Sequence, residues 1–285
     1  MHEFKYIEPT DTAQVIELLK EHGSSAAMMA GGTDLINHIR IGKRSPEVVL
    51  QLGKVRELIR SIEATDDGVF IGALATLTDV QTNELLMREF TALCEAAGRV
   101  GSKQIRNRAT LVGNICNASP AADTVPPLLL FDASVHILGV DGERMVPIDA
   151  FITAPGRTVL DAGELVTGVF IPRPKNRFYS AYCKLSRRRG VDLSTVGAAA
   201  AVCEDGARIA LGAVAAKAFR ATAAEEILKL GIDTNIEAAI AAVCKQASPI
   251  TDVRASADYR RAMAGAYAKK ALINALSYKV EGEVD

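Results

Sequence analysis

Apolar residues in the first 55 positions change repeatedly between helical and strand-like spacing. Positions 13–19 carry apolar residues at helical spacing, and residues 34–41 predict a second helix that ends before a glycine. Residues 26–30 and 48–52 are short apolar runs, typical of strands that are covered on both faces. This alternation of helix and strand predicts a small α/β lobe over residues 1–55.

After residue 55 the pattern of strands and helices is more mixed. Residues 165–171 form a strand-like run, and residues 85–97 have the apolar spacing of one helix. A hairpin is predicted over residues 135–146, because Asp141-Gly142 between two strand-like runs is a strong signal for a two-residue turn. We therefore expect a second, α+β lobe over residues 56–175.

A polar stretch with two prolines, residues 172–177, is the best candidate for a domain boundary. Beyond it the composition shifts toward alanine, and two apolar runs flank Asp205-Gly206 as a second hairpin. A three-stranded sheet with helices on one side fits a C-terminal domain over residues 178–285. Its helices are expected around residues 223–230, 236–247 and 258–276.

Composition places the chain among ordinary globular proteins rather than disordered or fibrous ones. Of its 285 residues, 49% are hydrophobic and 24% are charged, so a large core can form without a metal or a disulfide. Lysines and arginines number 33 against 34 aspartates and glutamates, which leaves a net charge of −1. A nearly neutral chain has no positive electrostatic field that would attract a polyanion, so we expect no nucleic-acid partner.

Cysteine usage and the start of the chain bear on the cellular compartment. The five cysteines include no C-x-x-C pair, and the histidines are scattered, which fits reduced thiols rather than a disulfide, zinc or iron–sulfur framework. The first residues lack a basic start with an apolar run, and no 18-residue stretch is free of charge and glycine. We expect a cytoplasmic chain with no metal site and no membrane association.

Two glycine-containing turns are candidates for anion binding, because the sequence has no motif of a Rossmann domain, P-loop, zincin or α/β-hydrolase. In residues 30–34, Ala-Gly-Gly-Thr-Asp, the paired glycines let backbone N–H groups point at an anion, and Asp34 begins a predicted helix. Residues 110–114, Thr-Leu-Val-Gly-Asn, have one glycine and also suit a strand end. On the sequence pattern alone, either segment can also be an ordinary turn or strand end that binds no anion.

Polar residues around the second turn each allow two interpretations. Asp123 ends a loop of small residues, where its carboxylate would either accept hydrogen bonds from ribose hydroxyls or cap a helix over residues 124–131. The pattern alone favours the cap. Three basic residues upstream either offset the charge of a pyrophosphate or form a solvated face: Lys103, Arg106 and Arg108.

A third group is Lys184, Arg188 and Asp192, spaced by four residues. On a helix these residues would share one face and form ion pairs. Residues 179–182 alternate like a strand, however, so we expect the group to lie across a strand end and the following loop.

Together these stretches resemble a known family, the FAD-binding (medium) subunit of molybdenum hydroxylases. That family includes xanthine dehydrogenases, aerobic carbon monoxide dehydrogenases and related hydroxylases of N-heterocycles or aldehydes. The matching stretches occur in the family's order and span about two thirds of the chain. They are residues 30–34, 71–73, 100–107, 113–115 and 118–120, with Asp123, Lys184, Arg188 and Asp192.

The resemblance implies a two-lobed FAD-binding domain of the vanillyl-alcohol-oxidase type, followed by a C-terminal domain peculiar to these flavoproteins. By position, residues 30–34 and 110–114 would hold the FAD pyrophosphate between the lobes, and Asp123 would contact the sugar or adenine side. Leu165 and Val166 would line the flavin, with Lys184 near its ring. The expected cofactor-binding residues are Met29, Ala30, Gly31, Gly32, Thr33, Asp34, Thr110, Leu111, Val112, Gly113, Asn114, Asp123, Leu165, Val166 and Lys184.

Two departures from relatives affect these expectations. The family usually has two glycines before the asparagine of the second turn, and Val112 replaces the first of them, which would crowd the phosphate or shift the backbone. Some relatives carry an inserted segment with a four-cysteine iron–sulfur cluster. Because this chain has no cysteine cluster, we expect it to hold flavin alone.

The resemblance also implies a role in electron transfer. Substrate would be hydroxylated at the molybdenum cofactor of a large subunit, and electrons would pass through a small [2Fe-2S] subunit to FAD on this chain and then to NAD or another acceptor. The flavin carries the redox chemistry, so no catalytic acid or base is expected among the side chains. Two alternatives remain: a stand-alone FAD-dependent oxidase or dehydrogenase, and a scaffold subunit without cofactor.

A cation close to the flavin ring would favour the reduced, anionic flavin. We therefore expect Lys184→Ala to lower the reduction potential of the bound flavin, as measured by redox titration. An unchanged potential would contradict a place for Lys184 near the ring.

Overall fold

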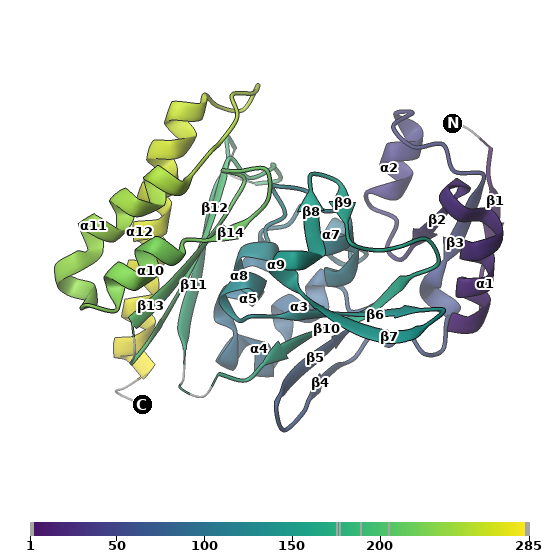
Figure 1. Cartoon of the computed structure of the whole chain (residues 1–285), viewed down its shortest axis with the longest axis horizontal. Helices are drawn as coiled ribbons and strands as arrows, with labels where there is room; N and C mark the ends of the chain where they lie inside the picture. The colour runs from purple at the N-terminus through teal and green to yellow at the C-terminus, as the bar shows by residue number, and fades with distance from the viewer. Residues whose placement is uncertain (1–2, 175, 177, 189, 205, 283–285) are drawn as a thin grey trace.

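The computed structural model describes residues 3–174, 176, 178–188, 190–204 and 206–282. Within them, sheets of three, five and four strands lie in a row along the long axis of the molecule, from the N-terminal end to the C-terminal end (Figure 1). This arrangement confirms the predicted α+β class. None of the described helices is long and apolar enough to cross a membrane. The predicted boundary and second hairpin include Lys175, Arg177 and Asp205, which lie outside the described residues.

The first sheet is parallel, and its middle strand is the last in sequence. Its strands are β1 (Lys5–Ile7), β2 (Ala26–Met29) and β3 (Val48–Gln51), in the order β1-β3-β2. Helices α1 (Thr12–His22) and α2 (Leu35–Arg40) connect them. Asp11 caps α1 by accepting a hydrogen bond from the N–H of Gln14, which satisfies one of the free donors at the helix start. All of these elements fall within the lobe that the sequence predicts over residues 1–55.

The second sheet is antiparallel, with helices packed on one face (Figure 1). Its order is β4 (Ile62–Ala64), β5 (Gly68–Gly72), β10 (Leu165–Pro172), β6 (Ser134–Gly139) and β7 (Gly142–Pro147). Val69, Ile71, Val135 and Val169 are fully buried between this sheet and the helices. The helices are α3 (Leu77–Thr82), α4 (Glu84–Glu89), α5 (Thr91–Gly98), α6 (Lys103–Arg106), α7 (Leu111–Cys116), α8 (Val125–Leu130) and α9 (Ile148–Phe151), and a small ribbon is formed by β8 (Ile152–Ala154) and β9 (Arg157–Thr158).

Two local predictions in this region need correction. The single helix expected over residues 85–97 is two helices, α4 and α5, which meet at Phe90. Phe90 leaves the helical conformation and buries its ring edge-on against Phe131, with 4.9 Å between ring centroids. The hairpin between β6 and β7 turns one residue earlier than expected, through Val140 and Asp141.

The C-terminal sheet is sandwiched between two layers of helices. Its strands are β11 (Tyr179–Leu185), β12 (Val196–Cys203), β13 (Gly206–Gly212) and β14 (Phe219–Arg220), so a short fourth strand joins the expected three. The helices are α10 (Thr222–Leu228), α11 (Ile232–Gln246) and α12 (Ala257–Gly282). Ala198 and Ala200 of β12 belong to the core beneath α12, whereas Ala199 and Ala201 belong to the core shared with the rest of the chain. Helices therefore pack closely on both faces of this small-residue strand.

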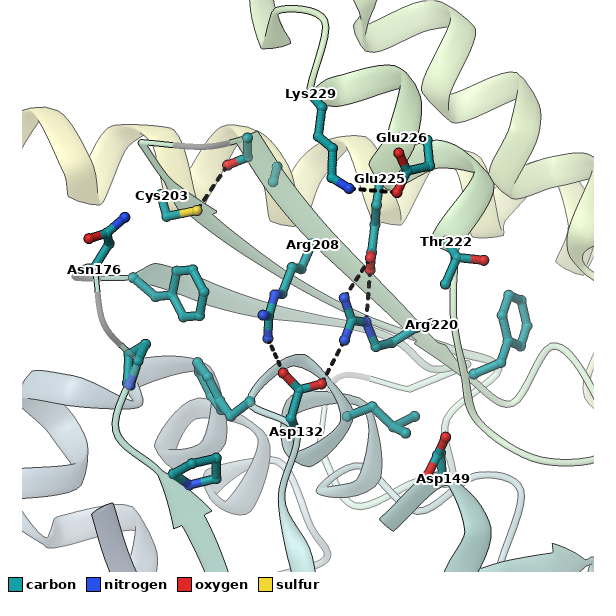
Figure 2. A pocket seen from close by; sticks show the side chains of 18 of the residues that line it. Asp132, Asp149, Asn176, Cys203, Arg208, Arg220, Thr222, Glu225, Glu226 and Lys229 are labelled. Atoms are coloured by element: carbon teal, nitrogen blue, oxygen red, sulfur yellow. Dashed lines mark hydrogen bonds and ion pairs between the residues drawn. The ribbon is translucent and has the colours of Figure 1, made fainter. Parts of the chain in front are cut away.

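Charged residues join α8 to the C-terminal sheet at one end of the interface (Figure 2). Asp132 follows α8 and accepts hydrogen bonds from Arg208 at 2.6 Å and from Arg220 at 2.7 Å. Arg220 also donates to both carboxylate oxygens of Glu225, at 3.1 and 2.6 Å. The Glu225 side chain is only 7% exposed and also accepts from the N–H of Ile209. This network therefore includes a largely buried, fully partnered ion pair.

We expect Glu225→Gln to lower the free energy of unfolding by about 2 kcal/mol, because it removes the more deeply buried of the two carboxylates that balance Arg220. The neighbouring variant Glu226→Gln is the matched control, since Glu226 is 69% exposed and pairs only with Lys229 in the described structure. Its effect should stay within about 0.5 kcal/mol. Urea denaturation measures both values, and equal losses would contradict the importance of the buried pair.

Candidate functional site

The first glycine turn lies directly against the segment that leads into the second. Residues 30–34 connect β2, which ends at Met29, with α2. A Cβ atom on Gly31 would lie 1.8 Å from the carbonyl oxygen of Arg108, a distance that no side chain tolerates. Glycine at this position therefore allows two backbone segments, far apart in sequence, to meet.

Backbone donors in the first turn are free to bind a ligand. The N–H groups of Gly31, Gly32 and Thr33 have no hydrogen-bond acceptor among the described residues. Successive unpaired N–H groups in a turn form a concave site that favours an anion. The geometry thus supports the anion-binding interpretation of this turn.

The second segment begins a helix rather than ending a strand. Thr110 caps α7, and its hydroxyl oxygen accepts from the N–H of Gly113 at 2.9 Å. Leu111 donates its N–H to Ala75, whereas the N–H of Val112 has no acceptor within the described ranges. Val112 is 7% exposed, and its side chain packs in the core. Asn114 accepts a hydrogen bond from Thr124 at 2.7 Å.

A cleft of about 410 Å³ opens between these two turns, and Ala30, Gly31 and Thr110 are among the residues that line it. Two of its cations are already paired, because Lys54 binds Glu8 at 2.8 Å and Arg60 binds Asp79 at 2.8 Å. Arg108 also lines the cleft, and its exposed side chain has no ion-pair partner in the part of the chain that the structure describes. Free N–H groups beside an unpaired guanidinium fit a diphosphate.

The other two basic residues of this region have different places. Arg106 donates to the side chain of Gln81 and to the carbonyls of Val100 and Gly101, so it braces the backbone. Lys103 is exposed on α6 and does not line the cleft. Of the three candidates, Arg108 is the one that the structure places at the cleft.

Asp123 is a buried hydrogen-bond acceptor and not a helix cap. Thr124 is the N-cap residue of α8, and no side chain caps that helix. The Asp123 carboxylate, 6% exposed, accepts from the Tyr182 hydroxyl at 2.6 Å, the Ser194 hydroxyl at 2.5 Å and the Lys184 ammonium at 2.8 Å. The capping interpretation, which the pattern alone favours, is therefore wrong.

Lys184 is buried beside Asp123, with 7% of its side chain exposed, and it donates a second hydrogen bond to the carbonyl of Arg99 at 3.0 Å. The sequence groups Lys184 with Arg188 and Asp192, which lie beyond the end of β11 as expected and pair with each other at 3.6 Å. From the sequence, Asp123 is expected at the sugar or adenine side of the cofactor and Lys184 near the flavin ring. In the structure, however, the two side chains contact each other.

Leu165 and Val166 begin β10 and are buried, with 1% and 4% exposure. Leu165 pairs with Leu138 of β6, and the register shifts by a bulge just after Val166. Both side chains belong to the core of the five-stranded sheet. Their expected contact with the flavin stays a prediction.

The structure therefore places the expected residues in three regions: the two glycine turns, the Asp123 and Lys184 pair, and the start of β10. Of the residues in the turns, Ala30, Gly31 and Thr110 line the cleft, and the others lie in the same segments without lining it. Sequence reasoning missed Tyr182 and Ser194. The alternation along β11 offered one signal, because residues two positions apart share a face and Tyr182 must lie on the face of Lys184. Nothing in the sequence pattern marked Ser194.

A larger cavity, of about 890 Å³, lies elsewhere, beside the Asp132 network (Figure 2). None of the residues expected to bind a cofactor lines it. Its labelled arginines, Arg208 and Arg220, point at Asp132 and are engaged there. No cluster of three or more potential metal-ligating side chains occurs among the described residues.

Comparison with known proteins gives one family for each part of the chain. The family described as "FAD binding domain in molybdopterin dehydrogenase" matches residues 2–174, and "CO dehydrogenase flavoprotein C-terminal domain" matches residues 180–275. A xanthine dehydrogenase FAD-binding subunit of Escherichia coli O157:H7 is 32% identical over 282 residues, which cover 95% of this chain and 96% of that protein.

Carbon monoxide dehydrogenases give matches in both sequence and structure. The medium chain from Hydrogenophaga pseudoflava is 31% identical over 280 residues, covering 94% of this chain and 96% of that one. A solved structure of carbon monoxide dehydrogenase from the same organism, which lacks the Mo-pyranopterin moiety of the molybdenum cofactor, superposes with a TM-score of 0.91 and 32% identity. The match covers 97% of this chain and 98% of that one.

The contact between the two turns can be tested without any ligand. Gly31→Ala should lower the free energy of unfolding by about 2 kcal/mol, because the added methyl group forces the backbone of Arg108 away. Gly53, which lines the same cleft, supplies the control, since a Cβ there comes no closer than 3.5 Å to another atom. Gly53→Ala should change stability by less than about 0.5 kcal/mol. Thermal or urea unfolding that fails to separate the two variants would contradict the close approach.

Proposed function

This chain belongs to the FAD-binding subunits of the molybdenum hydroxylases, and on that premise we propose that it carries electrons from a partner's iron–sulfur clusters through FAD to NAD or another acceptor. FAD is its cofactor, and it is an oxidoreductase subunit. The proposed partners are a large subunit with the molybdenum cofactor and a small [2Fe-2S] subunit. Support comes from relatives that are described as a medium chain and as an FAD-binding subunit of dehydrogenases.

The cleft between the two glycine turns carries this proposal. The free N–H groups of residues 31–33 and the guanidinium of Arg108 would bind the two phosphates, and the N–H of Val112 faces no competing acceptor among the described residues. We propose that residues 29–34 and 110–114 form this diphosphate site. Because Val112 packs its side chain in the core, its replacement of the usual glycine leaves the phosphate side of the loop clear.

Because Asp123 binds Lys184 directly, we propose that the flavin half of the cofactor lies toward both residues and toward Leu165 and Val166. This placement replaces the expected contact of Asp123 with the sugar or adenine side. When bound, FAD would supply the redox chemistry, taking electrons from the partner's clusters and giving them to NAD or another acceptor. The residues of this chain bind and orient it, and Lys184 holds a fixed positive charge beside it. No side chain needs to act as an acid or base in this role.

We also propose a division into two domains, over residues 1–175 and 178–285. The first domain has two lobes, near residues 1–55 and 56–175. The two separate family matches support this division, as does the core beneath α12, which contains only residues from Ala181 onward. A cytoplasmic location is proposed on the cysteines, all five of which are free thiols.

The decisive experiment is a titration of the stripped chain with FAD, followed by reduction assays. We expect one FAD per chain, which stays oxidised with small organic substrates alone and is reduced when the partner subunits and their substrate are added. Reduction by an organic substrate without partners would instead favour a stand-alone oxidase or dehydrogenase. Absence of binding would leave a scaffold subunit.

A pair of variants locates the site within the same titration. Arg108→Ala should raise the dissociation constant for FAD about tenfold, which corresponds to the loss of one charge-assisted hydrogen bond. Lys103 is also a cation but does not line the cleft, so Lys103→Ala should leave the dissociation constant for FAD within about twofold of the wild-type value. Equal effects of the two variants would indicate general electrostatics rather than a site at the cleft.

A further inference from the structure

We propose that Tyr182 and Ser194 are positioning residues that hold the Asp123 and Lys184 pair in one geometry against the flavin, and that Gly197 keeps the space that the Tyr182 hydroxyl needs. The inference rests on the proposed function, because it takes Lys184 to lie beside the flavin ring. It goes beyond that function by assigning a role to three residues outside the expected binding set.

The two hydroxyl groups reach Asp123 from different parts of the C-terminal domain. Tyr182 and Lys184 are two residues apart on β11 and point to the same face of the sheet, toward the segment before α8. Ser194 comes from the connection that leads into β12. Its carbonyl accepts a hydrogen bond from Arg254 at 3.1 Å, which fixes the backbone at that point. Asp123 is thus held from two directions.

Hydrogen-bond capacity shows how little freedom the ion pair has. A carboxylate offers about four acceptor positions and an ammonium group three donors. Asp123 uses three positions, for Tyr182, Ser194 and Lys184, and Lys184 uses two donors, for Asp123 and the Arg99 carbonyl. One donor of Lys184 therefore remains for a ligand, and its direction is set by the other bonds.

Tyr182 is suited to act as a permanent donor. Its side chain is buried, and this burial, together with the nearby charge of Asp123, raises the pKa of the phenol well above its ordinary value. The hydroxyl consequently keeps its proton throughout the neutral range. Asp123 therefore keeps this hydrogen bond at neutral pH.

Gly197 explains how a tyrosine fits between the sheet and Asp123. It is the cross-strand partner of Lys184, on β12. A Cβ atom on Gly197 would lie 2.6 Å from the Tyr182 hydroxyl oxygen but 3.4 Å from the nearest ring carbon. A methyl group at this position would therefore displace the hydroxyl, while the ring itself could stay.

The consequence for the flavin follows from charge balance. Hydroxyl donors disperse the negative charge of Asp123, so that the positive charge of Lys184 dominates at the flavin. Without them, the carboxylate opposes addition of electrons to the flavin, and Lys184 loses its fixed direction. Removal of either hydroxyl should therefore lower the reduction potential of the flavin and weaken FAD binding about tenfold.

The test compares Tyr182→Phe, Ser194→Ala and Gly197→Ala with the wild-type chain. The readouts are the dissociation constant for FAD, the flavin potential by redox titration and the unfolding temperature of the FAD-free protein. Each variant should bind FAD about tenfold more weakly and have a lower potential. Tyr259→Phe and Ser277→Ala, on α12 away from Asp123, are the matched controls and should match wild type in all three.

The double variant of Tyr182→Phe with Gly197→Ala gives the sharpest result. If the methyl group acts only by displacing the Tyr182 hydroxyl, it has no further effect once that hydroxyl is gone, and the double variant should bind FAD as Tyr182→Phe does. Additive losses would overturn the role of Gly197.

Variants that lower the unfolding temperature but keep wild-type affinity and potential would overturn the positioning role and leave a structural one. That outcome differs from failure of the proposed function, in which the wild-type chain itself does not bind FAD.

Discussion

A buried carboxylate needs hydrogen-bond donors or a cation to balance its charge, and much of this structure follows from how Asp123 obtains them. Its donors all come from β11 and from the connection into β12, so the charge cannot be buried until the C-terminal domain has packed on the rest of the chain. An unpaired carboxylate at that depth would cost several kcal/mol. Association of the two parts and formation of the Lys184 site are thus one event.

The sequence was most informative where local chemistry decides the structure. The apolar spacing of positions 13–19 and the glycine turn at residues 30–34 predicted their elements from neighbouring residues alone. The break between α4 and α5 was beyond such reasoning, because Phe90 leaves the helix to meet Phe131, forty-one positions later in the sequence. Strand β14, two residues long, likewise exists only because β13 offers it an edge.

The candidate site shows the same division. The family resemblance identified the two segments that meet at the cleft. It did not show why residue 31 has to be glycine, because the close approach of the Arg108 carbonyl depends on the tertiary structure. Asp123 looked like a helix cap because a carboxylate before a helical run usually is one. Its true partners, Tyr182 and Ser194, are 59 and 71 positions away, so their contribution depends wholly on tertiary packing.

Helix α8 is fastened to the C-terminal sheet on both sides, by Asp123 before it and by Asp132 after it. Contacts at both ends of α8 prevent rotation of the helix against the sheet, whereas a contact at one end alone would allow it. Contacts within the chain therefore form this interface, and if the flavin lies where we propose, no binding energy is needed to close it. On the proposed placement, FAD would bind to a site whose geometry is already formed, and its release would leave that geometry unchanged.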